Sequence, residues 1–138
     1  MAGRFINRYN SFCNSLDGLC MARQRDKSDP FVLSGTIQKY NLTFDISWKV
    51  MKDIVVKYHK KTDFALGSPR ENLRAARSVN LIDDDIWMDM LDDRNELAHD
   101  YDGKIAEACF DKIVNEYIPV FLEFKVNVEG YVKDMEEQ

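Results

Sequence analysis

Apolar runs long enough to cross a membrane are missing from this 138-residue sequence. A spanning helix needs about 20 consecutive apolar residues, so we exclude a transmembrane protein and expect no membrane partner. Residues 1–8 are polar and aromatic and lack the apolar centre of a secretion signal, which leads us to expect a cytoplasmic protein. The length is that of one domain, which we place at residues 1–138.

Cysteine is also scarce, with three residues. An odd number is not typical of a secreted disulfide framework. Cys13 and Cys20 are seven residues apart on one predicted helix, about 10 Å along its axis, which is too far for a bridge. No cysteines and histidines have the spacing of a metal site, and the run Asp83–Asp85 is better explained as helix capping, because consecutive helical residues face different directions. We therefore predict no metal and no cofactor.

Acidic residues outnumber basic ones, giving a formal charge of −5, but the charge is unevenly distributed. Residues 1–27 hold five basic and two acidic side chains, whereas residues 83–111 hold eleven acidic and two basic ones. This distribution excludes a uniformly basic nucleic-acid binder. It leaves room for a small basic patch or for a basic protein partner.

Apolar residues recur at three- and four-residue intervals along nearly the whole chain, which predicts helices throughout. Asp29-Pro30 and Ser68-Pro69 are start signals with a capping residue before a first-turn proline, and Asp102 is the predicted cap of the last helix. Pro119 is expected to kink that last helix. The predicted helices cover about residues 4–24, 30–61, 69–78, 83–98 and 103–131.

These helices predict an all-α fold, an up-and-down antiparallel four-helix bundle with one extra short helix. Their apolar stripes are broad and aromatic. Such stripes leave apolar surface exposed on a single bundle, so we expect a homodimer.

The segment 94–101 holds Arg94, His99 and Tyr101 within eight residues. Arginine presents a fixed, forked set of donors suited to phosphate, and histidine can take and give a proton near neutral pH. The second histidine, His59, follows Lys57 in the cationic last turn of a predicted helix, where the helix dipole explains it. Acid–base chemistry is therefore expected first at His99.

Arg94 and His99 are five residues apart, so on a regular helix they point about 140° away from each other. They converge if the last turn loosens, as Asp100, Asp102 and Gly103 favour, or if a second copy of the chain completes the site. A purely structural alternative is that Arg94 pairs with neighbouring acids such as Asp89 or Asp93, and that the helix dipole explains His99.

The pattern Arg94-Asn95-x-x-x-His99-x-Tyr101 resembles the signature of the HEPN superfamily, with the added tyrosine of its HepT-like branch. Segment 80–95 (NLIDDxxWxxMLxxRN) also resembles that branch, known too as nucleotidyltransferase substrate-binding proteins. Segments 44–49 (FDxxWK) and 68–70 (SPR) are similar to its second-helix and mid-chain patterns. The resemblance covers about residues 5–131.

The resemblance implies a dimeric helical bundle that acts as the toxin of a toxin–antitoxin pair, a metal-independent ribonuclease with RNA as substrate. It also implies a minimal nucleotidyltransferase antitoxin that silences the toxin by adding AMP to Tyr101. In that scheme His99 is the acid or base, Arg94 stabilises the transition state, and Asn95 binds phosphate or holds His99.

Two features of the sequence bear on RNA binding. Five acids surround the motif and repel phosphate: Asp92, Asp93, Glu96, Asp100 and Asp102. A basic face on the short helix is expected to compensate through Arg70, Arg74 and Arg77. Two alternatives stay open: a non-catalytic substrate-binding subunit of a two-component nucleotidyltransferase, and a structural helical dimerisation module.

Overall fold

The computed structural model describes residues 2–61, 66–83, 85–100 and 103–136, and all regular secondary structure within them is helical. The prediction of an all-α fold is confirmed. Among the described residues, no helix combines the length and the hydropathy that a bilayer crossing requires. The elements are α1 (Ala2–Cys20), the 3-10 turn η1 (Met21–Gln24), α2 (Pro30–Asp53), the π-helical turn η2 (Ile54–Tyr58), α3 (Pro69–Ser78), α4 (Asp85–Leu97), α5 (Lys104–Lys112), the π-helical turn η3 (Ile113–Tyr117) and α6 (Ile118–Glu136).

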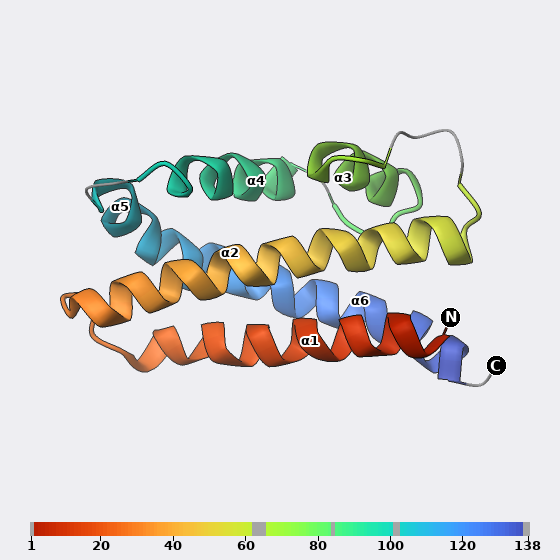
Figure 1. Cartoon of the computed structure of the whole chain (residues 1–138), viewed down its shortest axis with the longest axis horizontal. Helices are drawn as coiled ribbons and strands as arrows, with labels where there is room; N and C mark the ends of the chain where they lie inside the picture. Colours follow the sequence, from red (N-terminus) through yellow and green to blue (C-terminus); the bar gives the residue numbers. More distant parts are fainter. Residues whose placement is uncertain (1, 62–65, 84, 101–102, 137–138) are drawn as a thin grey trace.

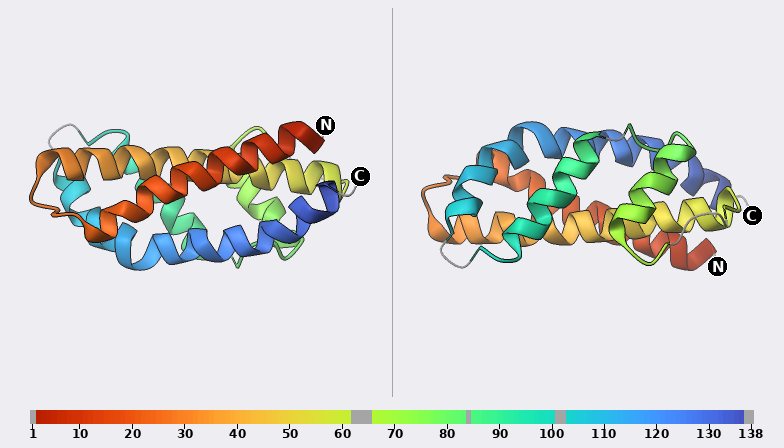
Figure 2. Two further views of the ribbon diagram at one scale, coloured as in Figure 1. Left: turned by 90° about the horizontal axis from the view of Figure 1, so that it is seen from below. Right: turned by 90° about the horizontal axis from the view of Figure 1, so that it is seen from above.

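Three long helical segments, α1, α2 and α6, form the body of the molecule (Figure 1). α1 runs from one end of the molecule to the other, and α2 runs in the opposite direction. The shorter α3 and α4 follow the direction of α1, and α5 and α6 follow that of α2. The start of α1 and the end of α6 therefore lie at the same end of the molecule. α3 and α4 cross obliquely over α2 and α6 (Figure 2, right). This arrangement places α4, the helix that contains Arg94 and Asn95, against the middle of α2.

Helix starts follow the local capping signals. The Asp29 side chain accepts a hydrogen bond from the backbone N–H of Phe31 (2.9 Å), and Pro30 occupies the first turn of α2. The Ser68 hydroxyl accepts one from the N–H of Glu71 (3.3 Å) at the start of α3. Each bond satisfies a backbone donor that the helix itself cannot pair. Both predicted helix starts are confirmed.

The last helical segment is irregular just before Pro119, as the sequence predicts. Proline has no N–H and its ring clashes with the carbonyl four residues earlier. The chain responds with η3, in which the N–H of Ile118 donates to the carbonyl of Ile113, a π-type bond. The chain changes direction between α5 and α6 (Figure 1).

The core is built around aromatic rings from four helices. Phe121 of α6 is fully buried, with its ring centroid 6.2 Å from Phe12, 6.1 Å from Tyr40 and 5.6 Å from Trp87. Edge-to-face and offset pairs of this kind add to the energy of apolar burial. Trp87 is therefore a core residue, as expected. The three thiols are free, and only that of Cys109 is buried; those of Cys13 and Cys20 are half-buried.

Candidate functional site

A solvent-open pocket of about 330 Å³ lies between α2, the start of α3 and α4. We call it the motif pocket. It joins three segments that are distant in the sequence, because α3 and α4 both pack on α2, one after the other along its length (Figure 2, right). It is lined by Phe44, Asp45, Trp48, Lys49, Pro69, Leu91, Arg94 and Asn95.

Asp45 of α2 holds the guanidinium of Arg94 in a bidentate pair. Arg94 Nε donates to one carboxylate oxygen (3.1 Å) and Nη2 to the other (2.9 Å). The hydrogen bond to Asp45 raises the pKa of Arg94 above its usual value, against a smaller opposing effect of burial. The structural alternative of an ion pair is therefore present, but Asp89 and Asp93 were the wrong partners, since the acid comes from another helix. A pair of this geometry fixes the plane of the guanidinium.

Trp48 and Lys49 of α2 also line the motif pocket. Trp48 is half-buried, and Lys49 is exposed with its Nζ 5.7 Å from the centroid of the indole. Unlike Trp87, Trp48 therefore presents part of its ring to solvent. A cation beside an aromatic face suits a nucleotide, which offers both a phosphate and a base that stacks.

His99 lies in the turn that follows α4, because the helix ends at Leu97. The N–H of His99 donates to Glu96 and the N–H of Asp100 to Leu97, both three residues back, so the last turn tightens as α-helical bonding stops. The helix therefore ends before His99, as the flanking residues favour. His99 is exposed and does not line the motif pocket, whereas Asn95 does. Tyr101 lies outside the described residues.

Most of the acidic residues around the motif have structural partners. Asp92 pairs with Arg70 (3.3 Å). Asp93 accepts hydrogen bonds from Lys112 (3.1 Å) and from the hydroxyl of Tyr117. The hydrogen bond to Asp93 raises the pKa of Lys112. Burial is the larger cause that raises the pKa of Tyr117, and the hydrogen bond to Asp93 raises it further. These contacts tie α4 to α3, α5 and η3, and they reduce the repulsion of phosphate that the sequence suggested.

Asp100 supplies a carboxylate that caps the start of α5. Its two oxygens accept hydrogen bonds from the N–H of Ile105 (3.2 Å) and of Ala106 (2.8 Å). The residue in the N-cap position is Gly103, at φ +76°, a left-handed conformation that glycine adopts without steric cost. The structure gives the N-cap position to Gly103, and Asp102, the predicted cap, lies outside the described residues.

The basic face predicted on α3 is engaged within the chain. Arg70 pairs with Asp92, and Arg74 pairs with Glu71 of the same helix (3.2 Å). Arg77 also has an interaction of its own. None of the three lines the motif pocket, whose α3 contribution is Pro69. The role of Arg70, Arg74 and Arg77 as RNA contacts remains a prediction.

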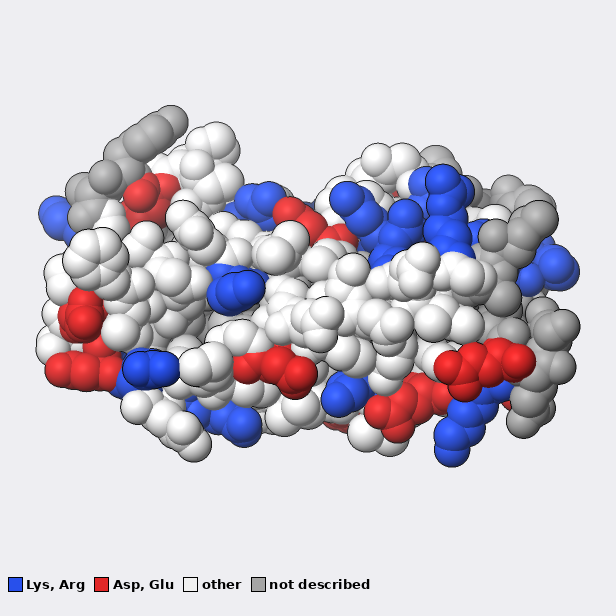
Figure 3. Space-filling view, turned by 60° about the horizontal axis from the view of Figure 1, so that its bottom comes forward, with Lys and Arg blue, Asp and Glu red and all other residues white. Residues whose placement is uncertain are grey.

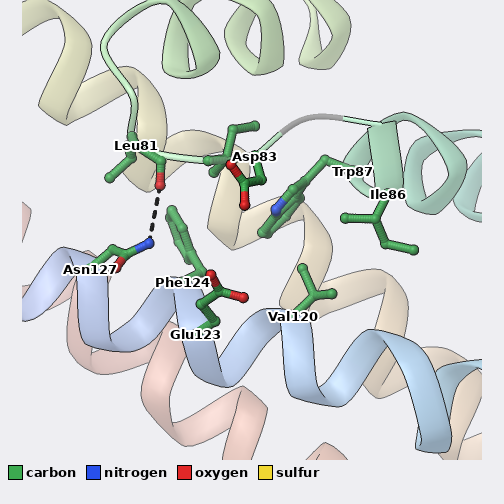
Figure 4. A pocket seen from close by; sticks show the side chains of 9 residues that line it. Leu81, Asp83, Ile86, Trp87, Val120, Glu123, Phe124 and Asn127 are labelled. Carbon is green, nitrogen blue, oxygen red and sulfur yellow. Dashed lines mark hydrogen bonds between the residues drawn. The ribbon is translucent and has the colours of Figure 1, made fainter.

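A second, smaller pocket of about 120 Å³ opens between α4 and α6 (Figure 4). Asp83 and Glu123 point into it beside the rings of Trp87 and Phe124, and Asn127 donates to the carbonyl of Leu81 across one side (3.4 Å). Two carboxylates repel an anion, so this pocket does not suit phosphate. No group of three or more potential metal ligands gathers anywhere in the described parts of the chain.

These features define a small helical protein whose open pocket presents an arginine, a lysine and a tryptophan. A family model described as nucleotidyltransferase substrate binding protein like matches residues 4–129. The chain belongs to this family, which is the HepT-like, HEPN-type family that the motif resembles. No curated protein matches the chain.

Proposed function

We propose that this protein is a HepT-like toxin, a metal-independent endoribonuclease whose active site uses Arg94 and His99. The observation that carries the proposal is the motif pocket, where three segments that resemble the family meet around Arg94 and Asn95. His99 is exposed in the turn that follows the same helix. In the proposed homodimer, a second copy brings its own exposed His99 to the shared site.

The proposed reaction needs only groups that RNA and the protein supply. The 2′-oxygen attacks the neighbouring phosphorus, the bond from phosphorus to the 5′-oxygen breaks, and the products are a 2′,3′-cyclic phosphate and a 5′-hydroxyl. One His99 takes the proton of the 2′-hydroxyl, and the His99 of the other copy gives a proton to the leaving 5′-oxygen. Arg94 stabilises the charge that builds on the phosphoryl oxygens.

Asp45 has a positioning role in this proposal. The bidentate pair uses two of the five N–H donors of the guanidinium, which leaves donors for a phosphate oxygen. Because Asp45 holds the plane of Arg94 before substrate binds, less conformational freedom is lost on binding. The carboxylate also lowers the net charge of the pair, so the phosphate is bound less tightly than by a free arginine.

The test of the proposed function is RNA cleavage by the purified chain in EDTA. We expect single-stranded RNA to be cut into fragments with 2′,3′-cyclic phosphate and 5′-hydroxyl ends, read by electrophoresis and mass spectrometry. An oligonucleotide of the same sequence with 2′-O-methyl groups should stay intact, because it lacks the nucleophile. Fragments with 3′-hydroxyl and 5′-phosphate ends would contradict the mechanism.

A second candidate function is that of a non-catalytic subunit that presents a substrate to a nucleotidyltransferase. Two observations favour it: Asp45 already neutralises Arg94, and His99 does not line the motif pocket. The family description also names substrate binding. If this second function is correct, the protein binds a nucleotide in the motif pocket and does not cleave RNA.

The nucleotidyltransferase partner separates the two candidates. With partner, ATP and magnesium ions, the toxin proposal expects the chain to gain the mass of one or more AMP units on Tyr101, two residues from His99, with loss of RNA cleavage. The added phosphate is a bulky anion that repels RNA. Intact-mass and peptide mass spectrometry measure the gain. Tyr101→Phe should remain unlabelled, and labelling of that variant to the same extent would exclude Tyr101 as the acceptor.

A further inference from the structure

A pocket rich in basic side chains lies between the first half of α1 and the second half of α2. We call it the basic pocket. Its volume is about 320 Å³, close to that of the motif pocket. Figure 3 shows lysine and arginine side chains gathered on this part of the surface, at the upper right. It is lined by Arg4, Arg8, Trp48, Lys49, Lys52, Asp53, Val56 and Lys57.

Among the described residues that line the basic pocket, the one acid, Asp53, is already neutralised. Asp53 is buried and accepts two hydrogen bonds from Arg8 Nη1 (2.9 and 2.8 Å). Arg4 and Lys52 are exposed and Lys57 is half-buried; within the described ranges, none of these three forms an ion pair. A chain with a formal charge of −5 therefore holds a local excess of positive charge that its own acids do not offset.

The basic pocket and the motif pocket adjoin each other and share part of their walls. Trp48 and Lys49 line both of them, so the indole stands at the boundary between the two. From Asp45 to Lys57 the α2–η2 segment rises about 18 Å. One strand of duplex DNA places a phosphate about every 3.4 Å, and at a similar spacing this surface accommodates about five nucleotides.

We propose that the basic pocket binds the backbone phosphates of single-stranded RNA that extends from the motif pocket, with Trp48 stacking on a base between the two sites. The proposal rests on the proposed function and names the part of the chain that holds the flank of the substrate. Unpaired cations, a partly exposed aromatic ring and an open groove are the combination that binds single strands without reading their sequence. Arg70 and Arg74 of α3 do not provide this combination, because each is paired with a nearby acid.

The test is binding of a labelled, non-cleavable 2′-O-methyl octanucleotide, measured by fluorescence anisotropy across salt concentrations. The variant combines Arg4→Gln, Lys52→Gln and Lys57→Gln, which leaves Arg8 on Asp53 and Lys49 at the motif pocket. Each lost phosphate contact lowers the slope of log affinity against log salt by about 0.7 for a single strand, so we expect a slope smaller by about 2. The matched control removes one arginine and two lysines elsewhere, by Arg23→Gln, Lys125→Gln and Lys133→Gln.

The proposal requires that only the basic-pocket variant bind the octanucleotide more weakly and with a smaller salt dependence. Both this variant and the control should bind a dinucleotide like the wild type, since a dinucleotide fills the motif pocket alone. Equal losses in the two variants would show only the effect of net charge and would overturn it. Unchanged octanucleotide binding by the first variant would also overturn it, as expected if the basic pocket receives an acidic protein partner. Because the probe cannot be cut, these outcomes are independent of the cleavage test.

Discussion

Replacing His99 with alanine is expected to lower the rate of RNA cleavage by about 10²–10⁴-fold, the usual contribution of a proton-transferring side chain. The side chain is exposed and its backbone N–H, not its imidazole, makes the bond to Glu96. The substitution therefore leaves the fold in place. Single-turnover cleavage in EDTA measures the rate, and thermal unfolding checks that the variant is as stable as the wild type.

His59→Ala is the matched control, since it removes the other histidine of the chain. His59 Nε2 is hydrogen-bonded to the hydroxyl of Tyr131 (2.9 Å), which joins the end of α2–η2 to α6. We expect this variant to lose some stability and to cleave RNA at the wild-type rate. Equal activity of His99→Ala and the wild type, in preparations free of other nucleases, would exclude His99 from the reaction.

Arg94→Ala is expected to reduce cleavage by about 10²–10³-fold, as for the loss of one preorganised donor to a developing anion. The Arg94 and Asp45 side chains are 26% and 34% exposed, so the stability lost with this pair is below about 1 kcal/mol. Arg94→Lys keeps the charge and loses the planar fork, and we expect it to recover only part of the rate. The rates of the two variants therefore separate the contribution of the positive charge from that of the planar fork.

Arg70→Ala supplies the comparison for Arg94. Arg70 also pairs with an aspartate across two helices, Asp92 of α4, but it does not line the motif pocket. If both arginine variants lose cleavage equally, the effect is loss of positive charge near the RNA. If Arg94→Ala retains full activity, the transition-state role assigned to Arg94 is wrong.

Local chemistry made most of the fold predictable. Asp29-Pro30 and Ser68-Pro69 begin helices because a side-chain acceptor and a preformed proline dihedral act within a few residues. Pro119 disrupts α-helical bonding for an equally local reason. The buried aromatic residues follow from helical periodicity alone.

The partners of the site residues were not predictable by the same means. Asp45 lies 49 positions before Arg94 in the sequence, and only the packing of α4 on α2 brings the two together. The segment 44–49 resembles the family pattern, but this resemblance does not predict that Asp45 is the partner of Arg94. The same reason explains Asp92 and Asp93, which the sequence presented as a source of repulsion and which the structure pairs with Arg70 and Lys112.

The cap of α5 illustrates a different limit. Sequence patterns favour an acceptor directly before the first helical residue, which pointed to Asp102. In the structure Gly103 has a left-handed conformation, and the side chain of Asp100 accepts hydrogen bonds from the N–H groups of Ile105 and Ala106. The sequence pattern did not single out Asp100, which lies three residues before the N-cap position and one residue after His99.

The two indoles of this chain report on different environments. Trp87 is sealed in the core, while Trp48 is partly exposed at the boundary of the two pockets. A molecule that enters either pocket displaces water from Trp48 and leaves Trp87 untouched. The intrinsic emission of the unlabelled protein therefore carries an occupancy signal against a constant background, so titrations need no dye.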